Sequence, residues 1–132
     1  MRPRGDLLLA HALHAAAWVA VRFTTPMRAH AALKKLGSHV GPLDDARARW
    51  LAGALEPWGS CLTRSLALSA RLPDAAVALA VVTGEQGGFH HAHAWVECHG
   101  RALRPSDVYG EVVAWLQRPG VISSSVGEGE LR

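Results

Sequence analysis

The chain has 132 residues, 49% of them hydrophobic, with a formal net charge of +3 and two cysteines. This length predicts a single domain, and the apolar fraction argues against intrinsic disorder. The basic residues are scattered arginines with one lysine pair, Lys34 and Lys35, which disfavours a nucleic-acid-binding protein. Because the cysteines form no CxxC pair, the sequence indicates neither a disulfide framework nor a zinc or thioredoxin-type motif.

Residues 1–57 have the composition and the apolar spacing of helices. We expect three helices here, over residues 6–23, 26–37 and 44–56. Asp6 is a suitable N-cap for the first helix, and Thr25 followed by Pro26 suits the start of the second.

The first predicted helix also imitates a secretory signal, because Arg2 and Arg4 precede an apolar run over residues 7–21. His11 and His14 interrupt that run, and no small-residue cleavage site with a polar mature start follows it. The run is also too short to span a bilayer comfortably. We therefore expect an ordinary helix of a cytoplasmic protein, with no firm membrane assignment.

The second half of the chain changes from helical to strand periodicity. Ser60 is placed to cap a fourth helix that begins at Cys61. We then expect strands over residues 75–83, 90–98 and 101–104, a loop over 85–88, a short helix over 109–116 and a flexible tail over 122–132. The predicted fold is α+β in one domain of residues 1–132. Its helical part covers residues 1–57, and its core over residues 58–118 packs the Cys61 helix on a small antiparallel sheet.

Cys61 and His93 have the residue types of a nucleophile and its base. A thiolate is the nucleophilic form of cysteine, and the first turn of a helix stabilises negative charge. A cysteine nucleophile also needs a base nearby, which a histidine on a neighbouring strand supplies. The alternatives are a small buried cysteine and a histidine that is satisfied within the core.

A third group should orient the imidazole of His93. Glu97 shares the strand face of His93 but lies roughly 13 Å away along the strand, which is too far for a direct hydrogen bond. With a three-residue loop over residues 98–100, His93 faces Pro105, which offers no acid. Asp107 then lies on a reachable diagonal, although it is equally suited to capping the helix expected after it.

Two motifs of this chain resemble those of a known family. CLTRSLAL begins at Cys61, and HAHAWVECHGR, which contains His93, follows about thirty residues later. Together they resemble the leader peptidases of lasso peptide biosynthesis, the B-protein family with a transglutaminase-like, papain-related Cys-His-Asp core. The resemblance covers roughly residues 58–107. The family's acid usually falls about a dozen residues after the histidine, where this chain has Pro105, and Asp107 is the substitute.

The resemblance implies a stand-alone cysteine peptidase that removes the leader from a ribosomally made lasso peptide precursor, before an ATP-dependent cyclase closes the ring. It implies Cys61 as nucleophile, His93 as base and Asp107 as the third residue, with no cofactor and no metal. Support for the oxyanion or the substrate is expected from Arg64, His91 and Trp95. The implied partners are the precursor leader, a separate winged-helix protein that binds the leader and, as a further candidate, the cyclase.

Three alternatives stay open at this point. His91, His93, Cys98 and His99 are residue types that bind zinc, so a structural metal site is one of them. The second is a transglutaminase-like acyl transferase, in which an amine replaces water as the acceptor. The third is a non-catalytic module that binds a partner, with which Pro105 in place of the acid is compatible.

Overall fold

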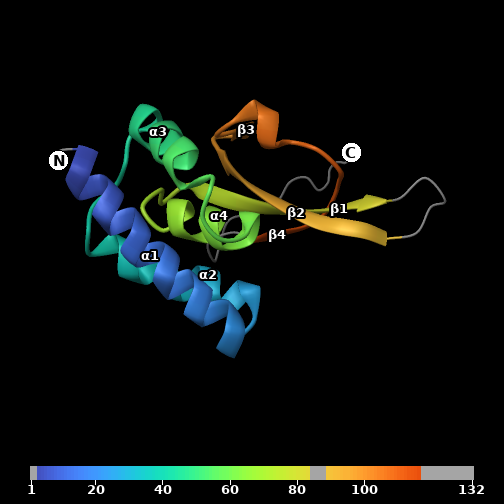
Figure 1. The fold of residues 1–132 in the computed structure, drawn as a ribbon, viewed down its shortest axis with the longest axis horizontal. Helices are drawn as coiled ribbons and strands as arrows, with labels where there is room; N and C mark the ends of the chain where they lie inside the picture. Colours follow the sequence, from blue (N-terminus) through green and yellow to red (C-terminus); the bar gives the residue numbers. More distant parts are fainter. Residues whose placement is uncertain (1–2, 84–88, 117–132) are drawn as a thin grey trace.

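The computed structural model describes residues 3–83 and 89–116 and has an α+β fold of helices and one antiparallel sheet (Figure 1). The elements in chain order are α1 (Pro3–Phe23), α2 (Pro26–Ser38), α3 (Asp45–Leu55), α4 (Cys61–Ser69), β1 (Ala75–Thr83), β2 (Phe89–Cys98), β3 (Arg101–Ala102), the 3-10 helix η1 (Pro105–Asp107) and β4 (Glu111–Leu116). The loop expected over residues 85–88 and the tail expected over residues 122–132 lie outside the described residues. The predicted α+β class is confirmed.

Side-chain caps fix the starts of three helices. The side chains of Thr25 and Asp44 each accept a hydrogen bond from the backbone N–H three residues further on. Ser60 and Thr63 form a capping box at the start of α4, in which each side chain pairs with the other residue's backbone N–H. These contacts confirm the predicted starts of α2, α3 and α4.

Asp6 does not cap the first helix as predicted. Helix α1 already begins at Pro3, and the side chain of Asp6 points into the protein, where the residue is 2% exposed. Its carboxylate accepts hydrogen bonds from Arg47 on α3 at 2.8 and 2.9 Å and from the buried Arg71 after α4 at 3.1 Å. A buried carboxylate needs such partners, so the residue joins three segments instead of ending one.

All four helices lie on one face of the sheet, whose strand order is β3-β2-β1-β4. Helix α4 packs between α1 and the sheet (Figure 1). Its Leu66 is fully buried in a cluster with Leu13 of α1, Val77 of β1 and Ala94 of β2. This packing fixes the start of α4, where Cys61 lies, relative to strand β2.

Residues 109–116 form no helix, so that prediction is wrong. Residues 111–116 form β4, which pairs antiparallel with β1 from Val81↔Glu111 to Val77↔Leu116. Because β1 offers a free edge to that segment, strand pairing outweighs its weak local preference for a helix.

The turn after β2 is also shorter than predicted. His99 and Gly100 both have positive φ, 54° and 77°, and Cys98 pairs directly with Arg101. This is a two-residue hairpin turn of the kind that matches the twist of the strands. The strand end predicted at Cys98 and the strand start predicted at Arg101 are therefore confirmed, whereas the three-residue loop over residues 98–100 and the register derived from it are wrong. Strand β3 ends at Ala102, which leaves the edge of β2 beside His93 without a strand partner among the described residues.

Candidate active site

Cys61 is the first residue of α4 and is half-buried. The Ser60 side chain accepts the Thr63 N–H, and the Ser60 carbonyl accepts the Arg64 N–H. Within the described residues, the N–H groups of Cys61 and Leu62 have no hydrogen-bond acceptor, as is usual for a first helical turn. The sulfur therefore lies beside two free donors at the positive end of a helix.

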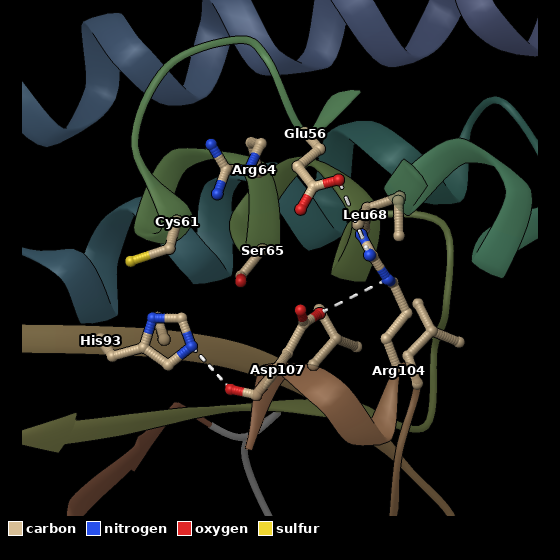
Figure 2. A pocket seen from close by; sticks show the side chains of 12 residues that line it. Glu56, Cys61, Arg64, Ser65, Leu68, His93, Arg104 and Asp107 are labelled. Atoms are coloured by element: carbon tan, nitrogen blue, oxygen red, sulfur yellow. Dashed lines mark hydrogen bonds and ion pairs between the residues drawn. The ribbon is translucent and has the colours of Figure 1, made fainter. Parts of the chain in front are cut away.

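A small pocket joins Cys61 to His93 on β2 (Figure 2). Figure 2 shows the sulfur and the imidazole facing each other across it, with Ser65 of α4 beside the gap between them. The pocket has a volume of about 40 Å³, which is room for a few water molecules. It therefore has room for the reacting atoms of a substrate between the two side chains.

The imidazole of His93 is held by the main chain of Asp107. Its Nε2 lies 2.6 Å from the Asp107 carbonyl oxygen. Because a carbonyl only accepts hydrogen bonds, Nε2 carries the hydrogen, and in the neutral ring Nδ1 is then free to accept a proton. Figure 2 shows this second nitrogen on the side of Cys61. His93 therefore has the tautomer that a base for the thiol requires.

Tyr109 stacks on the same imidazole, with ring centroids 3.9 Å apart and an interplanar angle of 21°. The face of a tyrosine ring attracts a cation, so Tyr109 is placed to contact the imidazolium that forms when His93 takes a proton. This role of Tyr109 was not predicted, because residue 109 was placed at the start of a helix. His91 lies at the edge of the same tyrosine, 6.0 Å between centroids.

The Asp107 carboxylate does not reach His93. It lies 4.0 Å from Arg104, which in turn lies 3.7 Å from Glu56 (Figure 2). The structure thus brings Asp107 to the predicted place but assigns the orienting contact to its carbonyl oxygen. The reason is that the chain leaves β3 after Ala102 and turns through η1, which points this carbonyl at the ring.

We expect Asp107→Ala to lower the rate of any reaction at Cys61 by less than about threefold, because the carbonyl contact survives the change. Asp107→Asn serves as the control, since it keeps the shape of the side chain and loses only its charge. Comparison of kcat for the two variants measures the effect. A fall of about 10³-fold or more in Asp107→Ala would show that the carboxylate itself orients the imidazole.

Arg64 and Trp95 have contacts other than those predicted for substrate support. The Arg64 guanidinium donates hydrogen bonds to the carbonyls of Trp58 and Gly59 at 3.1 and 2.9 Å, and it lines the pocket with its side chain. Trp95 is 2% exposed, and its indole N–H donates to Glu97 at 2.9 Å. Arg64 therefore holds the loop before the nucleophile, and Trp95 forms a buried wall beneath His93.

His14 of α1 contacts the first turn of α4, a contact that the sequence did not indicate. Its Nε2 lies 2.9 Å from the hydroxyl of Thr63, the capping-box residue of α4. Gly59 has a φ of 61°, and a Cβ at that position would lie 2.3 Å from this nitrogen. Burial, followed by the charges of His11 and Arg64, lowers the pKa of His14 below its ordinary 6.5. The neutral ring is therefore favoured at neutral pH.

We expect His14→Ala to lower the free energy of unfolding by about 1 kcal/mol and to slow the reaction at Cys61, because the start of α4 loses an anchor. Since the folded-state pKa is lowered, neutral His14 stabilises the fold above pH 6.5, and this contribution is lost as the pH falls below it. A double-mutant cycle with Thr63→Val measures the contact. Purely additive effects would contradict it.

Within the part of the chain that the structure describes, no three His, Cys, Asp or Glu side chains are grouped as a metal site would require. Comparison of the chain with protein-family models, curated proteins and solved structures finds no match. The geometry of this pocket and the two sequence motifs that line it are therefore the basis for inferring a function.

Proposed function

We propose that the chain is a cysteine peptidase that removes the leader from a ribosomally synthesised lasso peptide precursor. The observation that carries the chemistry is Cys61, at a helix start, facing an imidazole whose Nε2 is occupied by the Asp107 carbonyl. The substrate class rests on the resemblance of the Cys61 and His93 motifs to the leader peptidases of that pathway. In this proposal the core of α4 on an antiparallel sheet is a transglutaminase-like fold.

Acylation begins when Nδ1 of His93 takes the thiol proton and Sγ of Cys61 attacks the scissile carbonyl carbon. The carbonyl oxygen becomes an oxyanion, which the free N–H groups of Cys61 and Leu62 stabilise. The imidazolium then gives its proton to the departing amine. The C–N bond breaks, the rest of the precursor leaves as the core peptide with a free amine, and the leader stays on Cys61 as a thioester.

Deacylation uses the same groups in reverse. His93 takes a proton from water, and the hydroxide oxygen attacks the thioester carbonyl. The C–S bond breaks, the thiolate regains the proton from His93, and the leader leaves with a new carboxyl group. Tyr109 stabilises the imidazolium in both halves of the cycle through its stacked ring.

The proposed partners are the precursor leader, a separate winged-helix protein that presents it and the ATP-dependent cyclase that uses the freed amine. The proposed location is the cytoplasm, where the precursor is made. In this proposal the leader-binding protein supplies most of the recognition of the leader, and the pocket supplies the reacting groups.

Mass spectrometry of the precursor after incubation with this chain and the leader-binding protein tests the proposal. We expect cleavage at one bond, with two fragments whose masses sum to that of the precursor plus one water. A precursor that stays intact while the binding protein holds it would overturn the peptidase assignment. If a leader-amine adduct forms in place of the free acid when a primary amine is added, the acyl transferase is the better assignment.

A further inference from the structure

Helix α1 is apolar on two opposite faces. One stripe, which includes Ala10, Leu13 and Ala17, is buried in the core of the protein. The opposite stripe is exposed and consists of Leu8, Ala12, Ala15, Val19 and Phe23. A helix on the surface of a globular protein needs only the first of these stripes, because its outer face is normally polar.

The exposed stripe is long and continuous. Its residues follow at spacings of four, three, four and four, so they lie on one side of the helix over about 22 Å. Phe23 and Met27 end it at the corner between α1 and α2, where they are 83% and 65% exposed. Contiguous exposed apolar surface of this kind marks an interaction site.

The charge of this part of the chain is strongly one-sided. Residues 1–43 contain six Arg or Lys residues and one acid, whereas residues 44–132 contain eight Arg or Lys residues and ten acids. The one acid is Asp6, which is buried and paired with Arg47 and Arg71. The exposed surface of α1 and α2 therefore carries positive charge with no carboxylate to neutralise it.

Arginines border the apolar stripe itself. Arg4 and Arg22 lie on the same exposed side of α1, at its two ends. The guanidinium of Arg22 lies 4.1 Å from the centre of the Trp18 ring, and this tryptophan is 48% exposed. Apolar residues flanked by arginine and tryptophan are typical of a helix that lies at the boundary between lipid and water.

We propose that the exposed stripe of α1, with the corner at Phe23 and Met27, binds the surface of an anionic lipid membrane. Arg4–Phe23 is long and apolar enough to cross a membrane, the one such helix among the described residues. Its inner face is packed against α4, however, and Asp6 is bonded to two other segments, so the folded protein lies on the bilayer and does not span it.

Two features favour a membrane over an acidic protein as the occupant. Apart from the bordering arginines, the stripe offers no side chain that forms hydrogen bonds, whereas a protein interface carries about ten. The area of a stripe on a single helix is also smaller than the area of about 800 Å² that each partner buries in a stable complex. The stripe contributes no residue to the pocket of Cys61, so membrane binding leaves that pocket open.

Flotation of the full chain with lipid vesicles tests this proposal. The two probes are phosphatidylcholine vesicles and vesicles in which half of the lipid is phosphatidylglycerol. We expect binding to the anionic vesicles to be at least about tenfold stronger and to weaken as salt is added. Phe23→Glu should weaken it about tenfold or more, because a charge replaces the most exposed apolar side chain.

Val113→Glu is the matched control, since Val113 is 60% exposed on β4, away from the stripe. It adds the same charge and should leave vesicle binding unchanged. Quenching of tryptophan fluorescence by brominated lipid should be reduced in Trp18→Phe. Failure of the wild type to float with anionic vesicles, or equal losses in Phe23→Glu and Val113→Glu, would overturn the proposal. Cleavage of a precursor in solution by Phe23→Glu should equal that of the wild type, so this test stands apart from the peptidase assignment.

Discussion

Replacing Cys61 with alanine is expected to lower the rate of precursor cleavage by at least about 10⁴-fold, because the attacking sulfur is lost while the fold is kept. Cys98→Ala is the matched control. Cys98 is buried at the end of β2, and burial raises the pKa of its thiol, so it does not supply the nucleophile. Full activity of Cys98→Ala beside an inactive Cys61→Ala would identify the sulfur that reacts.

His93→Ala should be nearly as inactive as Cys61→Ala. A nucleophile and a base that act as one unit lose most of their rate enhancement when either of the two is removed. His99→Asn is its control, because His99 is exposed at the hairpin turn, where asparagine tolerates the positive φ. Residual cleavage near the wild-type rate in His93→Ala would contradict the role of the imidazole as base.

Alkylation with iodoacetamide gives a measurement that needs no substrate. Cys61 should react well before Cys98, because it borders the pocket while Cys98 is buried. In His93→Ala this advantage of Cys61 should shrink, since no base is left to take the thiol proton. If both thiols react slowly and at equal rates in the wild type, a non-catalytic module is the better assignment.

Asp6→Ala is expected to have the largest effect on stability, a loss of about 3–5 kcal/mol in the free energy of unfolding. Asp6 and Arg71 are both buried, with side chains 3% exposed, and their atoms lie 3.1 Å apart. Removing the carboxylate leaves the Arg71 charge buried with one partner fewer. Chemical denaturation of the variant beside Asp45→Ala, an exposed acid at the start of α3, measures the difference.

The contribution of Asp6 to the stability of the fold should also depend on pH. Hydrogen bonds from Arg47, and then from Arg71, outweigh burial and hold the pKa of Asp6 below its ordinary 3.8. The ionised carboxylate therefore stabilises the fold above pH 3.8, and this contribution is lost as the pH falls below that value. The stability gap between wild type and Asp6→Ala should be full at neutral pH and narrow in acid. A gap that is constant with pH would contradict this coupling.

The helices were predictable because their signals are local. Thr25, Asp44 and Ser60 are cap residues whose side chains bond within three residues, so short stretches of sequence specify them. Strand β4 was missed because its pairing partner, β1, lies about thirty residues away along the chain. Asp6 was misread for the same reason, since its arginine partners come from distant segments.

The placement of Cys61 and His93 followed from residue type and spacing, but the groups around them did not. The strand bounds at Cys98 and Arg101 placed the turn at His99 and Gly100 correctly, but the register was derived from a three-residue loop in which Gly100 alone was left-handed. The wrong register also affected the prediction of the group that orients His93. Only acidic side chains were considered for that role, whereas the group is a main-chain carbonyl. Tyr109 and His14 reach the site through tertiary contacts that no local pattern encodes.

The carbonyl that holds His93 has a genetic consequence. Every residue type has the same main-chain oxygen, so a missense change in the codon for Asp107 leaves the acceptor in place as long as the turn survives. Pro105, at the first position of η1, stabilises that turn through its fixed φ. Insertions or deletions between β3 and η1 would move the oxygen away from the ring. Mutations that change the length of this connection should therefore disturb the site more than mutations that change the identity of residue 107.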